Sequence, residues 1–409
     1  MNAPVTPPES STGSRLRRHV AQAAPVGQRA NSDAIQVMIV DDSLTVRTIL
    51  KRMVESDPAI AIVGTSSSAE RAIAQLAGIQ PDVILLDLEM PGMGGLKALP
   101  EILQTAKGAQ VLVVSSLTQD GAEQTVSALS MGAADTMLKP RPGGFNEEYR
   151  TQLLDKIRVL GDAKAQCAAA DDVANAADSA PRNSAETDAP HNKDRRLAVP
   201  AGSPEVLAIG ASTGGIHALN IMLRRLPADF DLPILITQHL PSSFIPVFAR
   251  QVAIACARPT VIAEDGTEIR KGEVAIAPGH GHMTVRRIGD RLVTRTLAQP
   301  APSGCLPSVD PMFSSLAAAC DGRVLAIVLS GMGRDGFEGA KDIVAAGGTI
   351  YAQDAGTSAV WGMPGAVSKA GLTALIAPPE GLADAVIEVA SGFARKEGVS
   401  RDSVAQERG

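Results

Sequence analysis

Three stretches in the second half of the chain carry residues that could together perform acyl transfer. Ser212 lies in the glycine-rich stretch Gly210–Gly214, directly after the β-rich run Val206–Ile209. A glycine-rich turn from a strand into a helix leaves a serine hydroxyl exposed at the carboxyl end of a sheet. His239 and Asp335 each follow a later apolar run. A serine nucleophile, a histidine base and an orienting aspartate form an acyl-transfer triad, so we predict serine hydrolase chemistry.

The glycine-rich stretch alone would also suit a turn that binds phosphate or packs closely against a neighbour. It is not a P-loop, because no Gly-Lys-Ser/Thr follows, and Ser212 stands where a dinucleotide fingerprint needs its second glycine. The chain order Ser, His, Asp differs from the Ser, Asp, His order of the α/β hydrolases. We therefore expect a fold different from theirs.

The residues alone leave the identity of the base open between His239 and His282. His280 and His282 could suggest a metal pair, but no third ligand stands close in the sequence. We therefore expect His282 to line or support the site. His217 falls in the first turns of the helix that follows Ser212, where we expect a polar packing role.

The first half of the chain carries a second set of reactive residues. Asp41 and Asp42, Asp87, Ser115 and Lys139 each follow a different apolar run. Carboxylates at one sheet edge repel one another unless a hard cation lies between them, and Mg²⁺ suits oxygen ligands. A lysine beside such an ion can neutralise phosphoryl charge, and a carboxylate can attack phosphorus.

Alternating strands and helices must position both sets of residues. In the first half, β-rich runs at 35–40, 61–63, 83–86, 111–114 and 136–138 alternate with helical periodicity. In the second half, the corresponding runs are 206–209, 234–237, 274–277, 292–294, 324–330 and 349–353. We predict two doubly wound α/β domains with mainly parallel sheets, whose reactive groups lie at the carboxyl ends of the strands.

Composition shifts divide the 409 residues into five parts. We predict a disordered extension over 1–33, a first domain over 34–158, a semi-flexible Ala-rich linker over 159–203, a second domain over 204–394 and a tail over 395–409. No apolar run reaches the roughly 18 residues of a membrane span, and no signal peptide is evident, so we expect a cytoplasmic protein without membrane insertion. The net charge of −6 gives no nucleic-acid signature. The four scattered cysteines argue against a structural zinc site.

The first domain resembles the response-regulator receiver domains. The motifs are Val-Asp41-Asp42-Ser, Asp87-Leu-Glu89-Met-Pro-Gly, Val-Ser-Ser116 and Lys139-Pro. The resemblance implies a flavodoxin-like fold with Asp87 as phosphoacceptor. It also implies Mg²⁺ bound by Asp41, Asp42 and Asp87 with the Glu89 carbonyl, Ser115 as switch hydroxyl and Lys139 at the phosphoryl group. The Ser115-Ser116 dipeptide blurs this register by one residue.

The second domain resembles the CheB family of chemotaxis protein-glutamate methylesterases. The matching stretches include Gly-Ala-Ser212-Thr-Gly-Gly, Gln-His239-Leu-Pro and Gly-Met332-Gly-Arg-Asp335-Gly. The resemblance favours His239 over His282 and implies a triad of Ser212, His239 and Asp335. It places Thr213 and the Met332 N–H near the oxyanion site. No cofactor is expected for the esterase.

Together the resemblances imply a phosphorylation-activated serine esterase. It would hydrolyse glutamate methyl esters on the cytoplasmic domains of chemoreceptors, release methanol, and also deamidate glutamines. Its phosphodonor would be a chemotaxis histidine kinase. The alternatives are a DNA-binding response regulator, disfavoured because no basic helix-turn-helix follows the linker, and a catalytically silent signalling scaffold.

Overall fold

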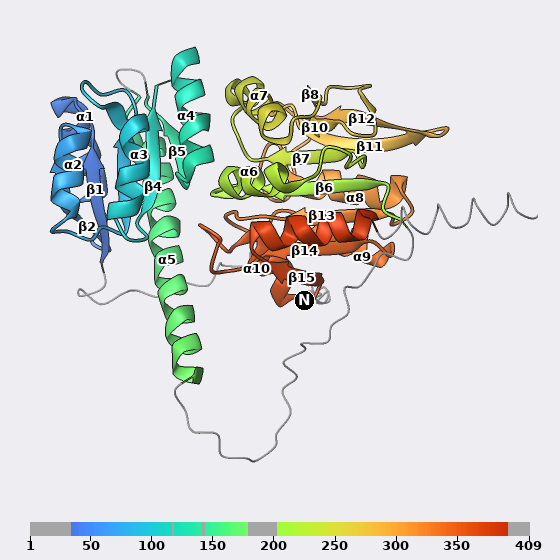
Figure 1. Cartoon of the computed structure of the whole chain (residues 1–409). Coiled ribbons are helices and arrows are strands. Elements are labelled where there is room, and N and C mark those ends of the chain that lie inside the picture. The colour runs from blue at the N-terminus through green and yellow to red at the C-terminus, as the bar shows by residue number, and fades with distance from the viewer. Residues whose placement is uncertain (1–33, 117, 141–143, 179–202, 392–409) are drawn as a thin grey trace, which may run out of the picture.

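The computed structural model describes residues 34–116, 118–140, 144–178 and 203–391. The predicted extension over 1–33, the end of the predicted linker and the tail lie outside these ranges. The described residues form two α/β units, joined through the chain after helix α5 (Figure 1).

The first unit is a five-stranded parallel sheet in the order β2-β1-β3-β4-β5. Its elements are β1 (Ile35–Val40), α1 (Leu44–Val54), β2 (Ile60–Ser66), α2 (Ala69–Leu76), β3 (Val83–Asp87), α3 (Gly94–Thr105), β4 (Gln110–Ser115), α4 (Gln119–Met131), β5 (Asp135–Leu138) and α5 (Glu147–Asp178). Helices α1 and α5 cover one face of the sheet. Helices α2, α3 and α4 cover the other.

Side-chain caps define where several of these helices begin. Ser43, Ser68 and Thr118 accept hydrogen bonds from backbone N–H groups in the first turns of α1, α2 and α4. Such caps satisfy N–H groups that have no partner inside the helix. They fix the helix starts directly after the strand ends, where the acidic residues lie.

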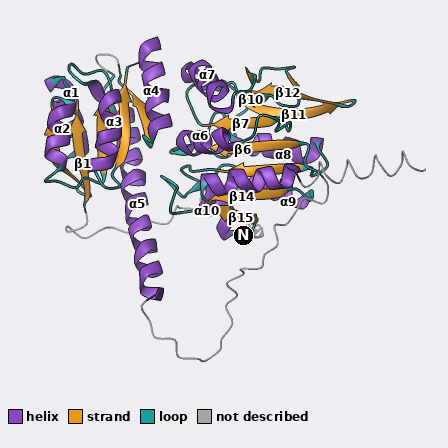
Figure 2. Cartoon of the chain, viewed as in Figure 1, coloured by secondary structure: helices purple, strands orange, loops and turns teal. Residues whose placement is uncertain are grey.

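The second unit has a seven-stranded parallel sheet in the order β15-β14-β13-β6-β7-β10-β8. Its strands and helices are β6 (Val206–Ala211), α6 (Gly215–Arg225), β7 (Ile234–Gln238), the 3₁₀ turn η1 (Ser242–Phe244), α7 (Ile245–Cys256), β8 (Thr260–Ile262), β10 (Val274–Ile276), α8 (Val309–Ala319), β13 (Val324–Val328), α9 (Phe337–Ala345), β14 (Thr349–Gln353), α10 (Met363–Lys369), β15 (Thr373–Ala377) and a helix over 379–391. Two layers of helices enclose this sheet (Figure 2). Helices α6, α7 and 379–391 pack on one face, and α8, α9 and α10 pack on the other.

A small antiparallel sheet in the order β11-β12-β9 stands beside the parallel one. It comprises β9 (Glu268–Ile269), β11 (His282–Ile288) and β12 (Arg291–Leu297). Strand β11 packs on α8. His282 therefore lies on a strand at the start of this sheet, a placement that the sequence pattern did not reveal.

The predicted fold class, two α/β domains with parallel sheets, is confirmed. The pattern missed the short strands β8 and β9, and it also missed β11 and β15, which are seven and five residues long. Helix α5 runs through the predicted domain boundary at 158, and Leu160 is still buried against the first sheet. The predicted boundaries otherwise remain predictions.

The two units meet along helix α4, which packs against α6 and α7. Buried apolar residues of both units form one continuous cluster, with Val126 and Leu129 from α4 and Ile216 and Phe244 from the second unit. Within the described ranges, no helix combines the length and apolar character that crossing a membrane requires.

Candidate active site

Ser212 lies on the turn between β6 and α6, at the carboxyl end of the central strand. Its N–H donates to the Ser330 carbonyl at 3.0 Å, which ties the turn to the neighbouring strand end. Gly214 has a φ of +76°, and a Cβ there would lie 2.5 Å from Ala359 and 2.7 Å from the Ser330 hydroxyl. The turn therefore needs glycine both for its left-handed backbone and for its space.

His239 follows β7 and links the serine to the aspartate. Its Nδ1 lies 3.1 Å from Ser212 Oγ, and its Nε2 lies 2.7 Å from Asp335 Oδ2. A proton on Nε2 donated to the carboxylate leaves the Nδ1 lone pair free to accept the serine proton. In the serine protease template, Nε2 contacts the serine and Nδ1 contacts the aspartate. Here the two nitrogens exchange these roles, but the histidine still links the serine to the aspartate.

Asp335 is buried in the loop after β13 and is surrounded by donors. Oδ1 accepts from the Ser308 hydroxyl at 2.7 Å and from the Gly336 N–H at 3.0 Å. Oδ2 accepts from the Val309 N–H at 2.7 Å, at the start of α8. A helix start favours a carboxylate, so the fold holds Asp335 ionised and in one orientation.

These contacts set the protonation of the pair. Burial alone would raise the pKa of Asp335, but the His239 hydrogen bond and the donors around the carboxylate hold that pKa well below its usual range. Burial alone would lower the pKa of His239, yet the hydrogen bond to Asp335, with a further contribution from Cys305, raises it to about 9. The imidazole is therefore a strong base that must first lose a proton to act.

The predicted oxyanion residues lie beside the serine. Thr213 is buried in the turn itself, and Met332 is half-exposed in the loop after β13. Gly331 precedes Met332, and a Cβ on it would lie 2.7 Å from Ser212 Cβ, so this loop lies against the nucleophile. The structure brings all five predicted esterase residues to the carboxyl ends of β6, β7 and β13.

Residues of the first unit also reach this site. The resemblance implied a receiver packed over the esterase entrance but did not identify the residues in contact. The Thr213 hydroxyl donates to Asp135 Oδ2 at 2.7 Å, and the Gly214 N–H donates to the Ala134 carbonyl at 2.6 Å. Lys156 holds the same Asp135 oxygen at 2.6 Å. A cavity of about 10 Å³ lies between Ser212 and residues 133–135, and another of about 480 Å³ is lined in part by Asp135, His239 and Leu240.

The other three histidines in the described ranges have other partners. His282 Nε2 donates to the Gln299 carbonyl at 2.7 Å, and Nδ1 accepts from the Ser308 N–H at 2.9 Å. Both nitrogens are therefore committed, and His282 positions the segment whose Ser308 hydroxyl holds Asp335. His280 is exposed and lies 3.5 Å from Glu264. His217 contacts the Ser130 carbonyl of α4 at 2.9 Å, so it packs between the two units.

A second cluster lies at the carboxyl ends of β1 and β3. Asp41, Asp42 and Asp87 each place one oxygen within 4.8 Å of the others. Lys139 Nζ lies 2.9 Å from Asp41 and 2.6 Å from Asp87. An all-oxygen donor set of this size is typical of a Mg²⁺ site in a receiver domain.

Charge and burial oppose each other in this cluster. Burial raises the pKa of Asp87 to about 6, although the hydrogen bond from Lys139 acts to lower it. Burial alone would lower the pKa of Lys139, but its bonds to Asp87 and Asp41 outweigh that effect and raise it. At neutral pH the pair is therefore ionised, with the lysine placed against the carboxylate.

The two serines after β4 differ in their surroundings. Ser115 is fully buried, and its hydroxyl has no hydrogen-bond partner among the described residues. Ser116 donates to the Glu89 carboxylate at 2.7 Å, while the Glu89 N–H donates to Asp87 Oδ1 at 3.0 Å. Ser115 ends β4, the strand paired with β3, and its role as the switch hydroxyl stays a prediction.

Comparison with known proteins assigns both units. Residues 207–386 match the CheB methylesterase family, and residues 37–144 match the response regulator receiver domain. A protein-glutamate methylesterase/protein-glutamine glutaminase of Rhodopseudomonas palustris is 37% identical over 378 residues, which cover 90% of this chain and 97% of that one. Its counterpart in Paramagnetospirillum magneticum is 39% identical over 370 residues, covering 88% and 97%.

A crystal structure of the Thermotoga maritima CheB methylesterase catalytic domain is 31% identical, with a TM-score of 0.45. It covers 46% of this chain and 99% of its own. The two whole-length relatives span the first unit, the second unit and the chain between them. The chain therefore belongs to the CheB methylesterase family, with an N-terminal response-regulator receiver domain.

Proposed function

We propose that this protein hydrolyses glutamate γ-methyl esters on chemoreceptors, with Ser212 as nucleophile, His239 as base and Asp335 as the orienting acid. The observation that carries the proposal is the continuous contact from Ser212 Oγ through the imidazole to Asp335, with distances of 3.1 and 2.7 Å. The family supplies the substrate class, because its whole-length relatives are named as protein-glutamate methylesterases.

In this reaction His239 Nδ1 accepts the Ser212 proton as Oγ attacks the ester carbonyl. The Thr213 hydroxyl and the Met332 N–H would stabilise the negative oxygen that develops. The imidazolium then gives its proton to the departing methoxide, and methanol leaves. Water, activated by the same base, hydrolyses the acyl enzyme and restores the serine.

The same machinery suits a second substrate, the side-chain amide of glutamine. An amide leaves as ammonia only after protonation, and the imidazolium beside Ser212 can supply that proton. The names of both relatives include protein-glutamine glutaminase. We therefore include deamidation of receptor glutamines in the proposed activity.

The receiver would control this activity through phosphorylation of Asp87 by a chemotaxis histidine kinase. Asp41, Asp42 and Asp87 would hold Mg²⁺ with the Glu89 carbonyl, and the close grouping of their oxygens supports this assignment. Bound Mg²⁺ would neutralise charge on the incoming phosphoryl group. Lys139 and Ser115 would then contact that group from β5 and β4, and such contacts can shift the position of α4.

The interface with the receiver supports a closed, inhibited state. Asp135 accepts from the Thr213 hydroxyl, which the oxyanion would need, and the Ala134 carbonyl accepts from the adjacent Gly214 N–H. The space of about 10 Å³ between Ser212 and residues 133–135 holds no more than about one water, so an ester could not enter from this side. We infer that phosphorylation separates the units and frees Thr213, Gly214 and the entrance for a receptor helix in the cytoplasm.

The decisive experiment measures methanol release from methylated receptor cytoplasmic domains, with and without acetyl phosphate. We expect release that depends on Ser212 and rises with the phosphodonor. A fluorophosphonate probe should label Ser212 under the same conditions. Failure of both would leave a catalytically silent scaffold, whereas labelling without methanol release would mean a different ester substrate.

A further inference from the structure

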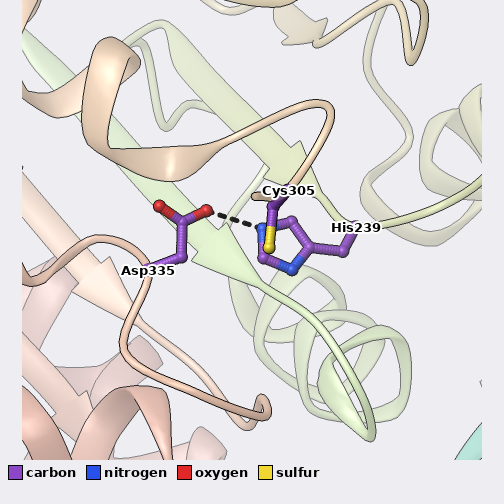
Figure 3. A group of neighbouring side chains, drawn as sticks. All are labelled: His239, Cys305 and Asp335. Atoms are coloured by element: carbon purple, nitrogen blue, oxygen red, sulfur yellow. Dashed lines mark hydrogen bonds and ion pairs between the residues drawn. The ribbon is translucent and has the colours of Figure 1, made fainter. Parts of the chain in front are cut away.

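A cysteine stands beside the catalytic pair and has no role in the proposed reaction. The Cys305 thiol, one His239 ring nitrogen and one Asp335 oxygen all lie within 4.8 Å of one another (Figure 3). The three residues come from separate segments, namely the loop before α8, the end of β7 and the loop after β13. The fold thus assembles three different donor types around one point.

The donor set has a definite chemical preference. A thiolate, an imidazole and a carboxylate are the common protein ligands of Zn²⁺, whereas Mg²⁺ prefers oxygen alone. Ligand bonds of about 2.0 to 2.3 Å place the donors of a tetrahedral zinc ion roughly 3.3 to 3.8 Å apart. The 2.7 Å between His239 Nε2 and Asp335 Oδ2 must therefore widen by about 0.6 Å, and the Cys305 thiol must come within about 3.8 Å of both atoms.

Several hydrogen bonds hold Asp335, whereas the Cys305 thiol has one long contact, 3.8 Å, with the Ser303 carbonyl. Asp335 is fixed by Ser308 and Val309, which leaves its Oδ2 facing the imidazole. Cys305 lies between exposed neighbours, Gly304 and Leu306. In known metal sites, hydrogen bonds to the metal-binding side chains orient them toward the metal. The hydrogen bonds to Asp335 would orient its carboxylate in the same way.

We propose that His239, Cys305 and Asp335 form an inhibitory Zn²⁺ site. His239 Nδ1 faces Ser212, so a metal shared with Asp335 must bind Nε2. Zinc would replace the Nε2 proton, and the thiol would lose its proton to solvent, leaving water in the fourth position. A neutral imidazole bound through Nε2 carries its proton on Nδ1, and it can no longer accept one from Ser212.

The metal is therefore an inhibitor of this esterase and not a cofactor. It leaves Ser212 and the oxyanion residues unoccupied but removes the base. The other histidine pair does not compete within the described residues, because both nitrogens of His282 are already hydrogen-bonded. The acidic receiver cluster is an all-oxygen site, so excess Mg²⁺ can keep it occupied during a zinc titration.

The inhibitory effect rests on the proposed role of His239, whereas the binding itself does not. The test therefore has two readouts on the full-length protein. The first is inhibition of hydrolysis of a small methyl ester by Zn²⁺ in excess Mg²⁺, normalised to the rate of each variant without Zn²⁺. The second is the ultraviolet charge-transfer absorbance that a thiolate gives with Cd²⁺.

Cys305→Ser should weaken inhibition at least about tenfold, since removal of even an outer partner costs 10- to 100-fold in metal affinity. The same variant should lose the Cd²⁺ absorbance assigned to this site. Cys256→Ser is the matched control, because Cys256 is a buried free cysteine remote from the cluster, and it should leave both readouts unchanged.

Equal zinc inhibition in Cys305→Ser and the wild-type protein would overturn the site. Cd²⁺ bound by Cys305 without loss of activity would overturn the inhibition and would count against His239 as the base. Hydrolysis that appears only after Zn²⁺ is added would instead refute the proposed zinc-free triad, and the absorbance would still decide whether the metal binds.

Discussion

The receiver and the esterase each place their reactive groups at the carboxyl edge of their own parallel sheet. Only in the esterase does one of these groups find its polar partner in the other domain. Asp41, Asp87 and Lys139 find their partners inside the receiver. In the esterase, the Thr213 hydroxyl is bound by Asp135 of the other domain. A site whose polar groups are satisfied by a neighbouring domain can be controlled by moving that neighbour.

The largest effect should come from breaking the esterase site alone. Ser212→Ala should remove nearly all methanol release, by roughly 10⁶-fold if the triad acts as a unit. Phosphorylation of Asp87 by acetyl phosphate should be unchanged, because the two sites share no residue. Methanol release near the wild-type rate in this variant would refute the nucleophile.

The next effect concerns the acid that orients His239. Asp335→Asn should lower activity by roughly 10³ to 10⁴. The carboxylate raises the pKa of His239 to about 9, so wild-type activity should rise with pH toward that value. Without the carboxylate, the rise in the remaining activity should move to lower pH. The measurement is kcat/KM for a small ester between about pH 6 and 10.

His282→Ala provides the comparison for that variant. His282 holds the Ser308 backbone and acts on Asp335 only through this segment, so its loss should cost much less than that of His239. Equal losses in His239→Ala and His282→Ala would reopen the assignment of the base.

A smaller effect should follow from separating the two domains. A truncated protein that begins near Gly202 should release methanol from methylated receptor about tenfold faster than the unphosphorylated full chain, equivalent to about 1.4 kcal/mol. Acetyl phosphate should close most of that gap in the full chain. If the truncated protein were no faster, the contacts of Ala134 and Asp135 would not inhibit, and phosphorylation would act by recruitment.

The smallest effect should appear in the receiver itself. Burial raises the pKa of Asp87 to about 6, and the carboxylate must be ionised to attack phosphorus. Labelling by acetyl phosphate should therefore fall as the pH drops below about 6. Lys139→Ala removes a group that lowers this pKa, so the same fall should begin at a higher pH. An unchanged pH profile in that variant would contradict the assignment.

Much of both sites could be predicted because their residues follow strands of strong apolar character. The runs that became β1, β3, β6 and β7 are buried throughout or nearly so, and the polar residue after each one is plain in the sequence. Parallel strands bring those residues together whatever their separation along the chain. The fold class could be predicted correctly because these apolar strands were also plain in the sequence.

The resemblance implied that the receiver packs over the esterase entrance, but the individual contacts between the two domains could not be predicted. Nothing in the sequence around Asp135 distinguishes it from a solvated strand residue, yet it bonds Thr213 and Lys156. Cys305 likewise lies in a loop between exposed residues, and only the tertiary fold brings it to His239. The contact of Asp135 with Thr213 and the position of Cys305 beside His239 both depend on tertiary packing between segments that are far apart in the sequence.

Strand β5 connects the phosphorylation site to the esterase site over a short distance. Asp135 begins the strand, and Lys139 follows its last residue, so about 13 Å of extended chain joins the group beside the phosphorylation site to the group that holds Thr213. Positions 135 and 139 fall on the same side of an extended strand. A displacement of Lys139 on phosphorylation can then be transmitted to Asp135 along one rigid segment of backbone. The length of the linker would set how often the two domains come into contact. It would not change how phosphorylation alters the contact between Asp135 and Thr213.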